Sequence, residues 1–186
     1  MDARRTEQGS TLVELMVVVG LLLILGLLST SFDTESWLAN YRLRSAARDL
    51  SMNMHKTRLN AIKGNRPWAI VFDTSKNCYH ICSGPGHDNK WSSTDDNQIE
   101  QTIVLSDYKS GITYGNGSAS RNVSGDGAIP TDSVSFNSNV LAFNSNGTAS
   151  GSGYCYISNN HKEVYAVGAL ASGSIRLKKW DGAAWK

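Results

Sequence analysis

The sequence predicts an α+β protein in which a long amino-terminal helix packs on a carboxyl-terminal antiparallel β-sheet or small sandwich. Three observations predict this fold class: an apolar run near the amino terminus, a helical repeat of apolar residues after it, and short β-type runs in the remainder of the chain. The 186 residues are 40% hydrophobic and 18% charged, with a net charge of +2. This composition excludes a disordered chain and gives no strong overall attraction to nucleic acid.

The first expected element is an apolar helix over residues 10–28. The run from Leu15 to Leu28 is apolar apart from two glycines. The eighteen residues from Thr11 to Leu28 would extend roughly 27 Å as a helix, close to the roughly 30 Å of a bilayer's hydrocarbon core. Arg4 and Arg5 precede the run and would hold the amino end in the cytoplasm. We therefore expect a single inner-membrane span, with the remaining chain in the periplasm.

The carboxylate of Glu14 lies inside the mostly apolar segment Thr11–Leu28, where it costs several kcal/mol unless an opposite charge reaches it. The segment Gly9-Ser10-Thr-Leu-Val-Glu14-Leu, followed by the apolar run, resembles the class III signal of type IV prepilins and type II secretion pseudopilins. The resemblance implies that a prepilin peptidase removes residues 1–9 by cutting between Gly9 and Ser10, and then methylates the new amino terminus. It also implies that Glu14 pairs with the terminal amine of a neighbouring subunit. Ser10 departs from the family, which usually has phenylalanine there.

Residues 29–66 are predicted to continue the same helix beyond the membrane. Six residues recur at spacings of three and four and form one apolar face: Leu43, Ala47, Leu50, Met54, Thr57 and Ala61. Gly64 and Pro67 would end the helix. Residues 42–66 hold seven Lys and Arg against Asp49 alone. This excess predicts either a surface for an acidic partner or an ordinary solvated helix face, and the second interpretation is favoured.

Residues 67–186 are predicted to form a β-rich globular domain. Short apolar or alternating runs mark the strands, and Gly, Ser and Asn clusters separate them. These runs are Trp68–Asp73, Cys78–Cys82, Ile103–Leu105, Val134–Phe136, Val140–Phe143, Tyr154–Ile157 and Ser174–Lys178. Residues 143–148 are typical of a hairpin turn, and residues 111–127 of a mobile surface loop.

Two further segments point to a subgroup of this family. The stretch from Leu43 to Leu50, and the phrase Thr57-Arg-Leu-Asn-Ala-Ile-Lys-Gly-Asn-Arg-Pro-Trp68, are similar to the GspH/FimT group of H-type pseudopilins and minor pilins. This resemblance implies the type IV pilin-like fold and a structural subunit that helps to initiate or cap a type II secretion pseudopilus or a type IV pilus. It implies three kinds of partner. Other pilins or pseudopilins are contacted through the amino-terminal helix, and the other two partners are the prepilin peptidase and an inner-membrane assembly platform. No cofactor is expected.

Three cysteines lie in the exported part, where disulfides persist. Cys78 and Cys82 would share one strand face but stand too far apart to bond to each other. Either one could pair with Cys155 across neighbouring strands, with Cys82–Cys155 slightly favoured. A zinc site of Cys78, His80, Cys82 and His87 is the alternative, but this spacing matches no common zinc motif, and we expect no metal.

Catalytic signatures are absent from the sequence. It has no nucleophile elbow, no phosphate-binding glycine loop and no paired-histidine zinc motif, and its four histidines are scattered. We therefore expect a structural protein and not an enzyme.

The carboxyl-terminal segment is both basic and aromatic. Arg176, Lys178, Lys179 and Trp180 would suit phosphate contact and base stacking. FimT-type minor pilins are similar in using a basic carboxyl-terminal region to capture DNA, so a DNA-binding minor pilin for natural transformation is the alternative function. The interpretation favoured over it is an edge strand protected by lysines, with its tryptophans packed on the domain.

Overall fold

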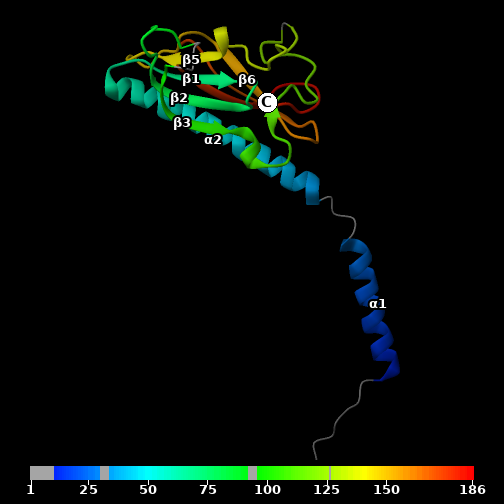
Figure 1. Ribbon diagram of the computed structural model, residues 1–186. Helices are drawn as coiled ribbons and strands as arrows, with labels where there is room; N and C mark the ends of the chain where they lie inside the picture. Colours follow the sequence, from blue (N-terminus) through cyan, green and yellow to red (C-terminus); the bar gives the residue numbers. More distant parts are fainter. Residues whose placement is uncertain (1–10, 30–33, 92–95, 126) are drawn as a thin grey trace, which may run out of the picture. The chain divides into compact units, whose positions relative to one another are not determined.

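The computed structural model describes residues 11–29, 34–91, 96–125 and 127–186. The described chain forms two compact units, which divide between Glu35 and Ser36. The first contains helix α1, and the second contains most of helix α2 and every strand (Figure 1).

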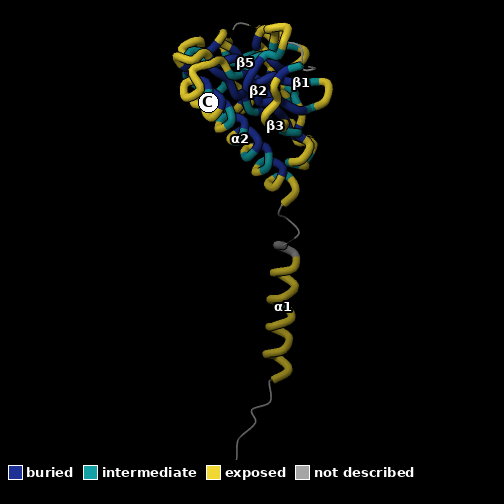
Figure 2. Tube along the Cα trace, turned by 60° about the vertical axis from the view of Figure 1, so that its left-hand side comes forward, coloured by how far each residue is buried: buried dark blue, intermediate teal, exposed yellow. Residues whose placement is uncertain are grey.

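Helix α1 spans Leu12–Ser29. Its amino end is capped by Thr11, whose hydroxyl oxygen accepts the backbone N–H of Glu14 at 3.3 Å. The large apolar side chains from Leu12 to Leu25 are 46–76% exposed, and Figure 2 shows this exposure along the helix. Within the described ranges, no helix combines the length and the apolarity needed to span a bilayer.

Helix α2 spans Thr34–Gly64. The predicted apolar face is confirmed, since all six of its residues are buried, together with two further alanines; the full set is Ala39, Leu43, Ala46, Ala47, Leu50, Met54, Thr57 and Ala61. The prediction that this helix continues the first one concerns residues 30–33, which lie outside the described residues.

The predicted end of α2 at Gly64 is confirmed, but the next residue makes the turn. Asn65 has a φ of 46°, in the left-handed region. This conformation lets Arg66 donate its N–H to the Ala61 carbonyl at 3.2 Å, while Asn65 donates to Ile62 at 3.3 Å. These bonds satisfy two carbonyls at the helix end, so the chain reverses directly into the first strand.

The strands form two antiparallel four-stranded sheets. The first sheet has the order β3-β2-β1-β5, and its strands are β1 (Trp68–Asp73), β2 (Cys78–Gly84), β3 (Gln98–Val104) and β5 (Val140–Phe143). The second has the order β4-β6-β7-β8, with β4 (Thr113–Tyr114), β6 (Gly153–Ser158), β7 (Val164–Ala169) and β8 (Ile175–Lys179). Two 3₁₀ turns, Leu105–Tyr108 and Asn137–Asn139, complete the domain.

The main hydrophobic core lies between α2 and both sheets. It joins Leu43 and Leu50 of the helix to Ile70 and Phe72 of the first sheet and to Ile157 of the second. Burying such side chains contributes about 1.5–3 kcal/mol each. The apolar face of α2 therefore holds the two sheets in one domain.

Polar contacts fix α2 on this core. Asp49 accepts the Tyr108 hydroxyl at 2.8 Å, and Asn53 donates to the Tyr79 hydroxyl at 2.8 Å. Nearer the helix end, Arg58 donates through Nε to the carbonyl of Gly147 at 2.8 Å. These bonds set the rotation and the position of the helix along the sheets.

Three features differ from the predicted β pattern. Val134–Phe136 is not a strand, and only Val134 forms an isolated bridge, to Cys155. The strand β7 was not predicted. The segment 111–127 is partly built into the domain, because Ile112 is buried and β4 pairs with β6. The predicted turn at 143–148 is confirmed, since Asn144 donates its N–H to the Thr148 carbonyl at 2.8 Å.

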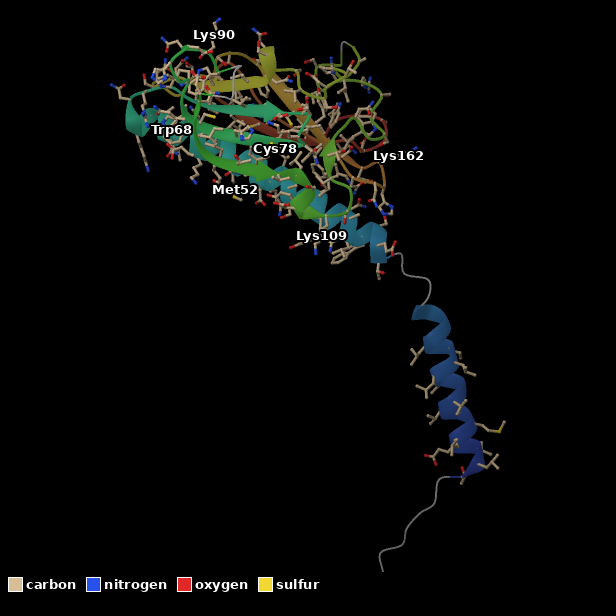
Figure 3. All side chains as sticks on the ribbon, in the orientation of Figure 1. Met52, Trp68, Cys78, Lys90, Lys109 and Lys162 are labelled. Carbon is tan, nitrogen blue, oxygen red and sulfur yellow. The ribbon has the colours of Figure 1, made fainter. Side chains whose placement is uncertain are left out.

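The core of α2 can be tested with two methionines of the same helix. Met54 is fully buried, whereas Met52, labelled in Figure 3, is 60% exposed. Met54→Ala should lower the free energy of unfolding by about 2–5 kcal/mol because it leaves a cavity. Met52→Ala should change it by no more than about 0.5 kcal/mol. Urea unfolding followed by tryptophan fluorescence measures both, and equal losses would contradict the assigned helix face.

Candidate functional site

The processing residues of the amino-terminal motif, Gly9 and Ser10, lie outside the described residues. Glu14 lies in the first turn of α1 and is exposed. A carboxylate is favourable there because the positive end of the helix dipole faces it. No Lys or Arg lies between Thr11 and Ser29, so α1 itself supplies no counter-charge for Glu14.

A second exposed apolar surface lies on α2. Trp37 and Tyr41 are 69% and 62% exposed, and their rings stack with centroids 5.9 Å apart. Further along the helix, Leu59 and Ile62 are also exposed. Sequence reasoning missed this surface, although an aromatic pair at i and i+4 is a signal for it.

The four arginines of α2, together with Arg66 just after the helix, divide into two groups. Arg42, Arg58 and Arg66 are engaged within the domain: Arg42 donates to Ser110 at 2.9 Å, Arg58 bonds Gly147, and Arg66 lies over the Trp68 ring. The other group meets the carboxyl-terminal tail. A surface hollow of about 430 Å³ is lined by Arg44, Arg48, Tyr165, Leu177, Lys179 and Lys186. The structure thus brings the basic residues of helix and tail together.

The tail forms an edge strand, as the favoured interpretation predicted. Strand β8 is the last strand of its sheet. Trp180 is only 4% exposed, and its ring meets Trp185 edge-on at 5.4 Å. Stacking on a nucleobase requires an accessible ring face, which Trp180 lacks.

Two of the four cations of the tail also have partners. Lys179 lies 2.8 Å from Glu163, and this hydrogen bond raises the pKa of Lys179. Lys186 lies 2.7 Å from Asp181. Arg176 is exposed and Lys178 is half-buried. The structure gives the DNA-binding alternative no support.

The cysteines do not pair as predicted. All three thiols are free and buried. Cys82 pairs with Ala69 and Ile99 in the first sheet, whereas Cys155 pairs with Val167 in the second. The expected Cys82–Cys155 bond is wrong, because Cys155 lies in the main core with Ile81, whereas Cys82 follows Ile81 and points to the opposite face of the first sheet. Burial raises the pKa of Cys82 to about 11.

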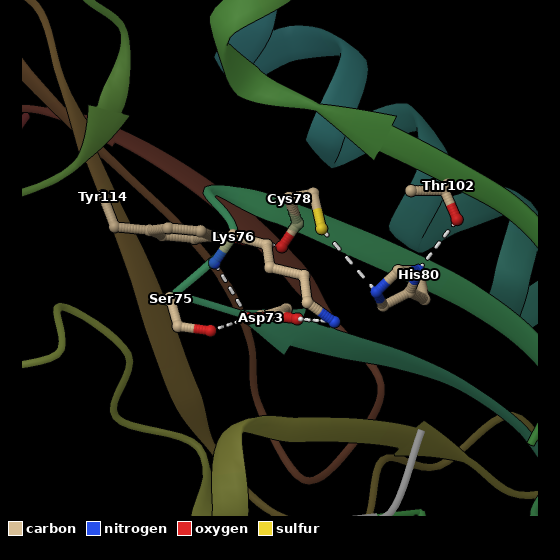
Figure 4. A network of polar contacts seen from close by, with 7 residues as sticks. All are labelled: Asp73, Ser75, Lys76, Cys78, His80, Thr102 and Tyr114. Atoms are coloured by element: carbon tan, nitrogen blue, oxygen red, sulfur yellow. Dashed lines mark hydrogen bonds and ion pairs between the residues drawn. The ribbon is translucent and has the colours of Figure 1, made fainter. Parts of the chain in front are cut away.

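The structure brings a different set of residues together at the end of the β1–β2 hairpin. Asp73 and Cys78 are direct cross-strand partners, and His80 follows on the same face of β2. Their ligand atoms all lie within 4.8 Å of one another, and Figure 4 shows the arrangement. Of the predicted zinc ligands, only Cys78 and His80 belong to this cluster. Asp73 was missed because its proximity depends on the register of the hairpin.

Comparison with known families gives one match. A family model described as "Type II transport protein GspH" matches residues 46–173. This segment contains most of α2 and all strands except β8. No curated protein matches the sequence.

Solved structures of similar fold come from two bacteria. The type IV minor pilin FimU of Pseudomonas aeruginosa has 15% identity and a TM-score of 0.52, over 79% of this chain and 94% of the other. The minor pseudopilin EpsH from the type 2 secretion system of Vibrio cholerae has 13% identity and a TM-score of 0.49, over 73% of this chain and 95% of the other. FimU shares the fold of this chain.

The structural role of the tail tryptophan can be tested against a neighbouring arginine. Trp180→Ala should lower the free energy of unfolding by about 3–5 kcal/mol because it empties a packed aromatic site. Arg176→Ala should change it by no more than about 0.5 kcal/mol. Both values come from denaturant titration of the full chain. Unchanged stability in Trp180→Ala would show that this ring is dispensable for folding.

Proposed function

The chain belongs to the GspH family of type II transport proteins, and we propose that it is a minor pseudopilin or minor pilin that helps to initiate or cap a filament. It is a structural subunit of the pilin type and not an enzyme. The observation that carries the proposal is the family match over α2 and the two sheets, joined to an amino-terminal segment of prepilin type. The subunit would associate with other pilins or pseudopilins.

The first step in this proposal is removal of residues 1–9. A prepilin peptidase cuts between Gly9 and Ser10 and methylates the new amino terminus. The motif Gly9-Ser10 followed by Glu14 and an apolar run supports this step.

Residues 10–28 then anchor the subunit in the inner membrane, and the folded domain stays in the periplasm. Arg4 and Arg5 before the apolar run support this orientation. The exposure of the apolar side chains of α1 also supports it, because large exposed apolar surfaces are normally covered by lipid or by another protein.

Glu14 would guide the subunit into the filament. A carboxylate in an apolar surrounding is tolerated when an opposite charge reaches it. The free amine that the peptidase creates on a neighbouring subunit supplies that charge. Leaving the membrane costs little hydrophobic free energy, because contacts with other apolar helices replace the contacts with lipid. The inner-membrane assembly platform would then draw the subunit out of the membrane.

Processing predicts a mass change that depends on one glycine. When the full chain is expressed with a prepilin peptidase, intact-mass spectrometry should show loss of residues 1–9 and addition of one methyl group. Gly9→Leu should abolish the cut because the bulky side chain blocks the bond to be cleaved. Gly20→Ala is the matched control, since a Cβ there meets nothing within 4 Å. An unprocessed wild-type chain would refute the processing step.

Assembly predicts a selective defect for Glu14. Glu14→Leu should insert and be processed normally, yet its recovery in cross-linked complexes with other pilins should fall at least about tenfold, equivalent to about 1.4 kcal/mol. Glu35→Leu, at the start of α2, should assemble normally. Normal assembly of Glu14→Leu would show that the carboxylate does not pair with the neighbouring amine.

A further inference from the structure

The cluster of Asp73, Cys78 and His80 lies on one face of the first sheet. Strands alternate their side chains between two faces. Phe72, Tyr79 and Ile81 point into the main core. Their chain neighbours Asp73, Cys78 and His80 therefore point to the opposite face. The hairpin register places Asp73 directly opposite Cys78, and His80 follows two residues later. Three different metal-binding side chains thus converge at one hairpin end.

The distance between the sulfur of Cys78 and the ring nitrogen of His80 fits zinc. The Cys78 Sγ lies 3.6 Å from the His80 Nε2. A tetrahedral zinc ion, with a Zn–S bond of about 2.3 Å and a Zn–N bond of about 2.05 Å, separates its sulfur and nitrogen ligands by about 3.6 Å. The carboxylate of Asp73 lies within 4.8 Å of both atoms, so it completes the ligand set after its side chain moves toward the ion.

The other nitrogen of His80 is already held. Its Nδ1 lies 2.8 Å from the Thr102 hydroxyl oxygen on the neighbouring strand β3 (Figure 4). A metal-binding histidine characteristically donates its second ring N–H to an oxygen, which fixes the ring and leaves the first nitrogen free to bind. Thr102 provides such an acceptor, and the bond aims Nε2 at Cys78.

The surroundings of the cluster tolerate a cation. Lys76 lies 3.4 Å from the Asp73 carboxylate, and its side chain is 73% exposed. A metal ion can therefore take over the role of this ammonium while Lys76 moves into solvent. Because zinc binds the thiolate form of cysteine, binding of the ion releases the thiol proton of Cys78.

We propose that Asp73, Cys78 and His80 bind one zinc ion, which joins β1 to β2 and leaves a fourth position for water or a ligand from another molecule. Sulfur, imidazole and carboxylate together match zinc, whereas calcium and magnesium bind oxygen ligands. Three protein ligands with an open fourth position form a complete zinc-binding set.

Zinc stoichiometry tests the proposal. The full chain, purified in detergent with its thiols reduced and stripped of metal, is dialysed against micromolar zinc, and bound metal is measured by mass spectrometry. The wild type should hold one zinc per chain. Cys78→Ala and His80→Gln should hold none. Cys82→Ala removes an equally buried thiol from the same strand and should keep the full amount. A wild type without zinc, or a Cys78→Ala chain that retains it, overturns the proposal.

Cobalt gives a second, spectroscopic measurement. Co²⁺ added to the metal-free wild type should produce a thiolate-to-metal absorption band, because Cys78 is a ligand. The band should be absent in Cys78→Ala and present in Cys82→Ala. No band in the wild type, or loss of the band only in Cys82→Ala, contradicts the assigned ligand set.

Thr102 tests the positioning of His80. Thr102→Val should weaken zinc binding by about 10–100-fold because the imidazole loses its orienting partner. Thr102→Ser keeps the hydroxyl and should restore the affinity. Equal affinity in wild type, Thr102→Val and Thr102→Ser would show that this hydroxyl does not orient a metal ligand.

Discussion

The domain depends on burial of one face of α2 against two separate sheets. Neither sheet is large, and both contribute side chains to the core that Leu43, Leu50 and Met54 fill. Removal of this face would expose the inner sides of both sheets at once, since within the described part of the second unit α2 is the α-helix that packs on that core. Polar bonds from Asp49, Asn53 and Arg58 then fix the helix in rotation. The fold therefore offers a rigid domain on a helix whose other surfaces remain available for neighbours.

Charge and apolarity are separated along the chain in a way that suits a filament subunit. Helix α1 is apolar and exposed, with the single carboxylate of Glu14 near its amino end. Helix α2 adds exposed aromatic rings at Trp37 and Tyr41. Most cations of the tail are instead held in ion pairs or at the edge of the second sheet. Among the described residues, the large exposed apolar side chains thus lie mostly on the two helices, which agrees with assembly through helices.

The spacing of apolar residues along the chain predicted the helix and most of the strands. The features that it missed depend on contacts between residues that are distant in the sequence. The buried face of α2 follows from a 3.6-residue repeat, which needs no knowledge of the sheets. Strand β7 was not predicted because it contains Gly168, a residue that is uncommon inside strands. A Cβ at Gly168 would come within 2.1 Å of the Gly153 carbonyl oxygen, so the neighbouring strand explains why this residue is glycine. The cysteine pairing failed for a similar reason, since spacing does not show that Cys155 points into the main core and Cys82 away from it. Asp73 joins Cys78 and His80 only through the hairpin register.

The proposed assembly requires that α1 of this chain contact the processed amino end of another pilin-type subunit. The most direct test places a photoreactive amino acid at Val17, one turn from Glu14 on the same side of α1. After irradiation of intact membranes that contain the partner subunits, mass spectrometry identifies the adducts. The account predicts adducts with the amino-terminal helix of a processed neighbouring subunit, and their loss in Glu14→Leu. Adducts with lipid alone, in cells that assemble the filament, would contradict it.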